Sequence, residues 1–235
     1  MGNRPGGELA TRPLHFIWIC DCSGSMASEG KIQALNTAIR ESLPAMKKVA
    51  EENPNAQVFL RALKFASDAE WITSKAEAID QYKWFDLVAN GETRMGKALS
   101  LVADQLKIPP MTDRALPPVL VLISDGQPTD DFDNGLKQLM NQQWGKKAVR
   151  IAIAIGRDAD LDVLQKFIGH SELKPFEAKN AEMLVQQIKW VSTAVVQSVS
   201  APASQAPGQV GPGVNVPIPK IPDDLTNSKP SGIVW

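Results

Sequence analysis

Short apolar runs alternate with amphipathic segments along most of the chain. Residues 16–20, 119–124 and 149–155 are almost wholly apolar, a pattern typical of strands buried on both faces of a parallel sheet. Other segments alternate apolar and polar positions or are rich in aromatic and β-branched residues, as half-buried and edge strands are. The predicted strands cover residues 16–20, 57–65, 69–74, 83–87, 119–124, 149–155 and 174–176.

Between these strands, apolar residues recur at spacings of three and four, which predicts helices with one buried face. The predicted helices cover residues 32–50, 94–106, 134–142, 161–168 and 181–197. Pro44 interrupts the first of them, and we expect it to kink that helix or to end its regular part. The alternation of strands and helices predicts an α/β fold, with a doubly wound, mostly parallel sheet flanked by helices.

Composition divides the chain into three parts. Residues 1–13 are rich in glycine and polar groups and are predicted to be a flexible N-terminus, and residues 14–200 carry the periodic pattern of one domain. Seven of the 17 prolines lie beyond residue 200, so 201–235 is predicted to be an extended tail. Because the tail ends in the apolar residues Ile233-Val234-Trp235, we expect this end to add to a groove or sheet edge, in cis or on a partner.

Charge and cysteine content narrow the class of protein. The 25 basic and 26 acidic residues leave a net charge of -1, which favours neither nucleic-acid binding nor a membrane surface. No apolar stretch near residue 1 has the length of a signal peptide or a membrane span. The two cysteines, Cys20 and Cys22, are too close in sequence for an unstrained mutual disulfide. A cytoplasmic location is therefore the expectation.

Two buried strands are predicted to end in an aspartate. Asp21 follows the run 16–20 and is itself followed by Ser23 and Ser25, and Asp125 follows the run 119–124. In open α/β sheets, ligands bind outside the carboxyl ends of the strands. A single aspartate there is more often a helix cap or turn residue, but two of them with paired hydroxyls indicate a shared site. Hydroxyl and carboxylate oxygens without thiolate or imidazole suit Mg2+ or Mn2+.

Here the sequence resembles the von Willebrand factor A domain over about residues 14–198. That family has a metal-ion-dependent adhesion site with the pattern Asp-x-Ser-x-Ser, a distant Thr and a distant Asp, and Asp21, Ser23, Ser25, Thr93 and Asp125 match it. The resemblance implies a Rossmann-like fold and direct metal contacts from Ser23, Ser25 and Thr93, with Asp21 and Asp125 acting largely through water. It further implies a non-enzymatic module whose metal binds an acidic residue of a partner protein.

A narrower resemblance lies in the segment Asp125-Gly-Gln-Pro-Thr-Asp-Asp131, which is similar to bacterial TerY-like proteins associated with tellurite resistance. It implies a cytoplasmic adaptor in a stress-response system, with a Ser/Thr kinase, a metal-dependent protein phosphatase or one of their substrates as partner. Two departures stand out. Glu92 replaces a glycine that is common before the threonine, and no cysteine follows Cys22, so a zinc ribbon is not expected.

Two other functions compete with a binding module. An α/β phosphatase or phosphotransferase with an aspartyl nucleophile at Asp21 would need a second acidic residue two positions later, where this chain has Ser23. A structural subunit would have a closed metal site, blocked by the Glu92 carboxylate. His15 and His170 neighbour no nucleophile motif and are interpreted as ordinary solvated histidines, and Cys22 as a small residue that fills a tight loop.

Overall fold

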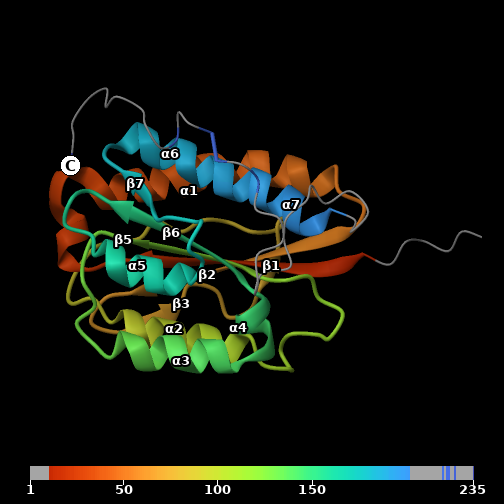
Figure 1. The fold of residues 1–235 in the computed structure, drawn as a ribbon. Coiled ribbons are helices and arrows are strands. Elements are labelled where there is room, and N and C mark those ends of the chain that lie inside the picture. Colours follow the sequence, from red (N-terminus) through yellow and green to blue (C-terminus); the bar gives the residue numbers. More distant parts are fainter. Residues whose placement is uncertain (1–10, 202–218, 220, 223–224, 226–234) are drawn as a thin grey trace, which may run out of the picture.

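The computed structural model describes residues 11–201, 219, 221–222, 225 and 235 and contains a seven-stranded sheet (Figure 1). The strands are β1 (Arg12–Asp21), β2 (Ala56–Phe65), β3 (Ala69–Trp71), β4 (Glu77–Ala78), β5 (Val119–Ser124), β6 (Val149–Ile155) and β7 (Phe176–Ala178). Their order across the sheet is β3-β2-β1-β5-β6-β7, and β4 also pairs with β2. β1, β2, β5, β6 and β7 run parallel, whereas β3 and β4 are antiparallel to β2.

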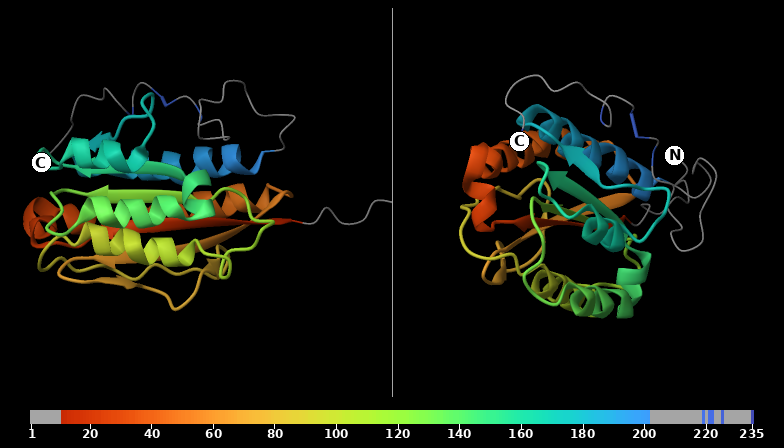
Figure 2. Two further views of the ribbon diagram at one scale, coloured as in Figure 1. Left: turned by 60° about the horizontal axis from the view of Figure 1, so that its bottom comes forward. Right: turned by 60° about the vertical axis from the view of Figure 1, so that its left-hand side comes forward.

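Helices cover both faces of this sheet. They are α1 (Lys31–Glu51), α2 (Met95–Gln105), α3 (Phe132–Asn141), α4 (Gln143–Lys147), α5 (Leu161–Ile168), α6 (Ala181–Trp190) and α7 (Val196–Ser200), with a 3-10 segment η1 (Gly24–Gly30) and a π-helical turn η2 (Val191–Val195). α1, α6 and α7 pack on one face, and α2 and α3 pack together on the other (Figures 1 and 2). The predicted doubly wound α/β fold is therefore confirmed.

The central strands place the polar cluster at one edge of the sheet. β1 and β5 are fully buried over most of their length, as their unbroken apolar runs predict. Cys20 pairs in register with Ile123, which brings the next residues, Asp21 and Ser124, side by side at the carboxyl ends of the two strands. Asp125 follows directly, so both aspartates leave the sheet at the same place.

The alternative that Pro44 ends the regular part of the first helix is wrong, and the other alternative, a kink at the proline, stays a prediction. α1 continues through Pro44 to Glu51. Ile39 and Met46, on either side of the proline, are fully buried, and the packing of this face against the sheet and α6 outweighs the cost of the proline, which is about 3 kcal/mol. The segment 181–197 is helical as predicted, but it is divided by η2.

The prediction of a strand at 83–87 is also wrong. The segment is irregular because its backbone bonds to a side chain instead of to a strand: Leu87 donates to Asn36 Oδ1 at 2.8 Å, and its carbonyl accepts from Asn36 Nδ2 at 2.9 Å. Trp84 Nε1 donates to the same Oδ1 at 3.1 Å. The aromatic residues that are typical of a strand therefore lie in a loop that is hydrogen-bonded to Asn36 of α1. The predicted strand 174–176 begins at Phe176 instead.

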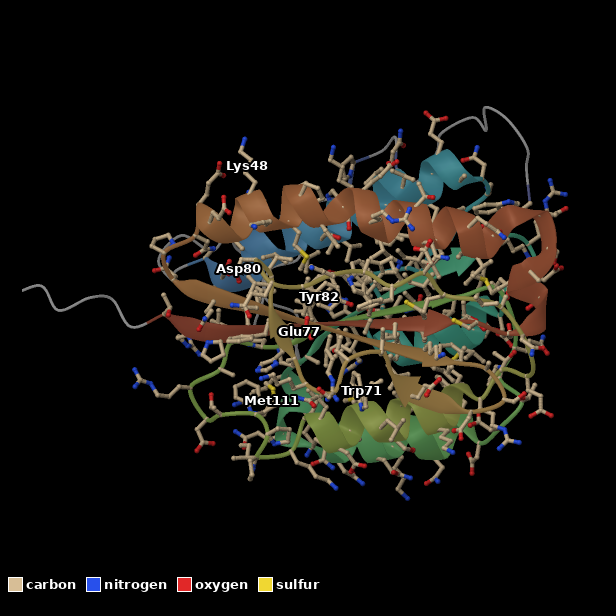
Figure 3. The ribbon with its side chains drawn as sticks, turned by 180° about the vertical axis from the view of Figure 1, so that it is seen from behind. Lys48, Trp71, Glu77, Asp80, Tyr82 and Met111 are labelled. Carbon is tan, nitrogen blue, oxygen red and sulfur yellow. The ribbon has the colours of Figure 1, made fainter. Side chains whose placement is uncertain are left out.

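Side chains of the β2 to α2 connection reach both faces of the sheet. Figure 3 shows Tyr82 on the α1 side and Trp71 on the α2 side. The Arg61 guanidinium stacks 3.9 Å from the centre of the Trp71 ring and donates to the carbonyls of Thr73 and Ser74. This cation–π contact fixes the edge strand β3 against the domain.

Described residues of the tail lie against the domain. Leu225 and Trp235 are buried; the Leu225 carbonyl accepts from Gln187 Nε2 at 3.2 Å, and the Trp235 backbone N–H donates to the Lys179 carbonyl at 2.9 Å. For Trp235 the expectation of docking in cis is met. Apart from residues 201, 219, 221–222, 225 and 235, the predicted tail lies outside the described residues, as do residues 1–10. β1 already begins at Arg12.

The state of the cysteines and the character of the helices are two further features of the fold. Cys20 and Cys22 are free thiols, both buried. Among the described residues, no helix has the length and apolar character needed to cross a membrane.

Candidate metal centre

Asp21 organises the first loop of the site. It is the last residue of β1 and has no exposed surface. Its Oδ1 accepts the backbone N–H of Ser23 at 2.8 Å, and its Oδ2 accepts the hydroxyl of Ser124. The turn after β1 is thereby fixed so that Ser23 and Ser25 follow on the same side.

The serine hydroxyls and Asp125 form one contiguous set of oxygens. Ser23 Oγ and Ser25 Oγ are 3.0 Å apart, and Ser25 Oγ donates to Asp125 Oδ1 at 2.7 Å. Ser23 and Asp125 are buried, whereas Ser25 is exposed. The set therefore meets the solvent on the Ser25 side.

Thr93 completes the cluster from a third segment. A Cβ atom placed on Gly126 would stand 3.8 Å from Ser25 Oγ and 3.9 Å from Thr93 Oγ1, so both hydroxyls face the same space. The backbone N–H of Gly24 donates to the Gly91 carbonyl at 2.9 Å, which joins the two loops. The structure thus brings together all five residues predicted from the sequence: Asp21, Ser23, Ser25, Thr93 and Asp125.

The segment after Asp125 holds Thr93 in place. The Thr93 N–H donates to Thr129 Oγ1 at 3.1 Å, and the Thr129 N–H donates to the Thr93 carbonyl at 2.9 Å. The Asp130 carboxylate accepts the N–H groups of Gly96 and Lys97, both at 2.8 Å, and so caps α2 from another loop. Sequence reasoning assigned no role to Thr129 or Asp130, because their partners are more than 30 residues away.

Lys31 is a further residue that sequence reasoning missed. It is the first residue of α1, it is buried, and its Nζ lies 2.9 Å from Asp125 Oδ2. A signal was present in the sequence: Lys31 precedes Leu35 and Ala38 at helical spacing, so it stands on the predicted apolar face of the helix. A lysine there needs a buried partner.

The charges of the site are only partly balanced. Burial raises the pKa of Asp21 to about 6; the hydrogen bonds from Ser124 and Ser23 oppose this rise, and the nearby charge of Asp125 adds to it. Asp125, in contrast, has the Lys31 ammonium beside it. A cation among these oxygens would stabilise the ionised form of Asp21.

The donor set fits a hard divalent cation. It contains three hydroxyls and two carboxylates, and such oxygen donors with water completing the shell are what Mg2+ and Mn2+ take. Among the described residues, no group of three or more His, Cys, Asp or Glu side chains is placed to hold a metal ion. The candidate centre does not contradict this, because only two of its five residues are of those types.

Glu92 does not contact the hydroxyl cluster. Its side chain is 55% exposed and its carboxylate lies 3.2 Å from Arg94 Nε, while its N–H donates to Ser67 Oγ at 3.0 Å. The carboxylate thus lies at the surface beside Arg94, and this position does not support the alternative in which Glu92 closes the site.

Cys22 is unsuited to redox chemistry. Burial raises the pKa of its thiol to about 12, so the thiolate needed for nucleophilic reactions is scarce near neutral pH. This agrees with its interpretation as a small residue that fills a tight loop. A cavity of about 260 Å3 lies beside the site and is lined by Cys22, Val88 and Gly91, among others.

Comparisons with known proteins agree with this geometry. The sequence model described as von Willebrand factor type A domain matches residues 17–190. A comparison with curated protein sequences gives no match. The fold is similar to a von Willebrand factor type A structure from Catenulispora acidiphila, with a TM-score of 0.59 and 15% identity over 80% of this chain and 43% of that one.

Two further solved structures show the same fold. The pilus adhesin SpaC from Lactobacillus rhamnosus GG has a TM-score of 0.64 and 13% identity, over 81% of this chain and 31% of that chain. Proximal thread matrix protein 1 from the mussel byssus, solved with a zinc-occupied MIDAS motif, has a TM-score of 0.59 and 13% identity, over 81% of this chain and 50% of that chain. The present chain thus spans half or less of the length of these three relatives.

Proposed function

The chain belongs to the von Willebrand factor type A domain family, and from that membership we propose that it is a binding module which uses a divalent cation to hold an acidic residue of a partner protein. The observation that carries the proposal is the convergence of three loops. Ser25 Oγ contacts both Ser23 Oγ and Asp125 Oδ1 and faces the same space as Thr93 Oγ1.

The residues divide into two roles in this proposal. Ser23, Ser25 and Thr93 would hold Mg2+ or Mn2+ through their hydroxyl oxygens, and the bound cation would supply an electrophile that accepts a carboxylate oxygen. Asp21 and Asp125 orient those donors, since Asp21 fixes the Ser23 backbone and Asp125 fixes the Ser25 hydroxyl. Mostly neutral direct donors would leave the cation attractive to an anionic partner.

The structure disfavours an enzyme with Asp21 as nucleophile. Both oxygens of Asp21 accept hydrogen bonds and the residue has no exposed surface, whereas a nucleophile must reach its substrate. A second acidic residue two positions later is also missing, since Ser23 stands there. A binding role therefore explains the site better than phosphoryl transfer.

Apolar side chains beside the site suit a protein partner. Val88 and Phe85 are 81% and 59% exposed; Val88 lines the cavity next to Cys22, and Phe85 lines a neighbouring one of about 310 Å3 that shares Lys64 with it. We propose that residues flanking the partner's carboxylate dock there. Exposed large apolar residues grouped beside a binding site are typical of interaction surfaces.

The narrower assignment rests on the segment Asp125-Gly-Gln-Pro-Thr-Asp-Asp131 and its resemblance to TerY-like proteins. We propose on that basis a cytoplasmic adaptor in a stress-response or tellurite-resistance system, whose partner is a Ser/Thr kinase, a metal-dependent protein phosphatase or one of their substrates. The positions of Thr129 and Asp130 support a site-related role for this segment, because both bond to the loop that carries Thr93.

The test measures metal binding and carboxylate recognition separately. Titration calorimetry with Mg2+ and Mn2+ is done on the wild type, on Asp21→Ala and on Thr93→Ala, with Thr112→Ala, an exposed threonine outside the site, as the matched control. An array of peptides is then probed with the full chain, each Asp or Glu peptide beside its Asn or Gln counterpart, with and without chelator. Cation binding lost in Asp21→Ala, and metal-dependent binding restricted to acidic peptides, would support the proposal.

The contrary outcomes are distinct. If the wild type binds neither cation, the metal centre is wrong. If it binds metal but no acidic peptide in a metal-dependent way, the cation has only a structural role.

A further inference from the structure

Lys31 places a buried positive charge against the candidate centre. Only 5% of its side chain is exposed, and its Nζ lies 2.9 Å from Oδ2 of Asp125, which has no exposed side-chain surface. The other oxygen of the same carboxylate accepts the Ser25 hydroxyl at 2.7 Å. One carboxylate is therefore shared between a candidate metal ligand and a lysine, and a lysine is rarely buried without such a partner.

The surroundings of Lys31 hold it in this position. A Cβ on Gly156, at the end of β6, would stand 3.3 Å from its Cε and 3.4 Å from its Nζ, and the same point is 3.4 Å from Cβ of Trp235. Gly156 has a φ of 78°, which favours glycine. The end of the lysine side chain thus lies against Gly156, where a larger residue would crowd it, and Trp235 lies against the same glycine.

Helix electrostatics do not explain why a lysine stands here. Lys31 is the first residue of α1, where the helix dipole favours negative side chains and disfavours positive ones. The ion pair with Asp125 must offset both this repulsion and the loss of hydration on burial. A role at the site accounts for its position where a role in the helix does not.

The charges of the residues in the pocket indicate what Lys31 does at the site. Asp21 and Asp125 bring two negative charges, the three hydroxyls bring none, and Lys31 returns one positive charge. The bonds to Asp21 come from neutral donors, the Ser23 backbone and the Ser124 hydroxyl. The pocket therefore offers one net negative charge to a cation instead of two.

We propose that Lys31 is a built-in counter-cation of the metal centre: it stabilises the metal-free site and weakens divalent cation binding. This rests on the proposed function, because it presumes that the hydroxyl cluster holds a metal. A divalent cation in the pocket leaves one unbalanced positive charge, and an anionic side chain from a partner would then meet a net positive site. Lys31 is a positioning and affinity-setting residue, not a ligand.

The experiment compares Lys31→Met, which keeps the length and removes the charge, with Lys31→Arg, which keeps the charge. Mn2+ affinity is measured by titration calorimetry on the full chain, and thermal unfolding is followed with and without Mn2+. We expect Lys31→Met to bind Mn2+ at least ~10-fold more tightly. The variant removes a unit positive charge from beside Asp125, and the repulsion between such a charge and a nearby cation is large enough for this change at an effective dielectric constant near 20. Lys31→Arg stays within about threefold of the wild type, since it leaves the same charge in place.

Thermal unfolding gives the second readout. Without metal, Lys31→Met unfolds at a lower temperature than the wild type because Asp125 loses its partner, and saturating Mn2+ raises its midpoint by more than it raises that of the wild type. If the variant folds only with metal, the Mn2+ concentration at half-folding gives an upper limit on its dissociation constant, because part of the binding free energy is used to fold the chain. A variant that stays unfolded in saturating Mn2+ would show that the metal cannot replace the lysine charge, which overturns the proposal.

Failure of this inference differs from failure of the proposed function. A wild type that binds no cation removes the metal centre itself. A wild type that binds Mn2+, together with a Lys31→Met variant of equal or weaker affinity, retains the centre and shows that Lys31 is not its counter-charge.

Discussion

The indole Nε1 of Trp235 donates to the Glu29 carbonyl at 3.0 Å, a contact between residues 206 positions apart. Glu29 belongs to η1, which follows Ser23 and contains Ser25, and its φ of 53° lies in the left-handed region. A non-glycine residue there costs about 1–2 kcal/mol, and the indole bond holds the carbonyl in that arrangement. Trp235 thus fastens the segment between the candidate ligands and Lys31.

From this contact we predict that Trp235→Ala lowers the free energy of unfolding by about 2–3 kcal/mol, because a buried indole and its hydrogen bond are lost. Trp235→Phe keeps most of the apolar contact and loses only the indole donor, so we expect a loss of about 1 kcal/mol. Urea unfolding of the full chain measures both. Equal midpoints for the wild type and Trp235→Ala would mean that the tryptophan does not dock in solution.

From the burial of His15 we predict that the folded state loses stability in acid. The interpretation of it as a solvated histidine is wrong, because it is partly buried and stacks on Phe59 with ring centroids 5.7 Å apart. Burial lowers its pKa from 6.5 to about 4. The unfolded chain takes up a proton near pH 6.5 and the folded chain does so only near pH 4, so stability falls as the pH drops between these values, by at most about 3 kcal/mol.

In the metal-free protein, Asp21 changes the pH dependence of folding stability in the opposite direction. Because its pKa is about 6 in the fold and 3.8 otherwise, it favours the folded state at the acidic end of this range. The variant His15→Phe keeps a ring against Phe59 and retains Asp21. The difference in unfolding free energy between it and the wild type therefore gives the contribution of the histidine alone. Unfolding at pH 4.5 and 7 measures it; a difference that does not change with pH would contradict the prediction.

The contact between α2 and α3 predicts a strict need for glycine at position 135. A Cβ there would stand 2.2 Å from the Gly96 carbonyl oxygen and 2.7 Å from its Cα, and these are backbone atoms that cannot turn away. We expect Gly135→Ala to destabilise the fold by about 2 kcal/mol or more, although alanine favours the helix itself. Gln138→Ala, at an exposed position of the same helix, should change stability by less than about 0.5 kcal/mol in thermal or urea unfolding.

The parts of the fold that follow from local sequence pattern were predictable. The runs 16–20 and 119–123 are apolar throughout because both faces of β1 and β5 are buried, and the sheet topology then places Asp21 and Asp125 together. The candidate ligands could be found because each is next to such an element or matches a family motif.

What the sequence could not predict depends on contacts between distant residues. The segment 83–87 has the composition of a strand, but the side chain of Asn36 takes its backbone bonds. Lys31 and Asp125 are 94 positions apart, and nothing local reveals that the one neutralises the other. In both cases a single polar side chain decides the outcome, and periodicity does not report where such a side chain points.

Asp130 and Asp131 give a matched pair for testing how the Thr93 loop supports the site. The Asp130 carboxylate caps α2, directly after Thr93, by accepting from Gly96 and Lys97, whereas the Asp131 carboxylate caps α3 by accepting from Asn134 at 2.9 Å. Replacing either residue by alanine removes a helix cap, at a cost of about 1–2 kcal/mol.

Only the α2 cap is next to a candidate ligand, Thr93. We therefore predict that Asp130→Ala weakens Mn2+ binding by roughly 3- to 10-fold. Asp131→Ala should lose a similar amount of stability but leave Mn2+ binding unchanged. The loss of affinity follows from the entropy needed to order a loosened Thr93 loop, about 1 kcal/mol for each residue freed. Calorimetric titration and thermal unfolding of the two variants provide the comparison. Equal Mn2+ affinities in two equally destabilised variants would show that the cap of α2 supports the fold alone and that Thr93 is held independently of it.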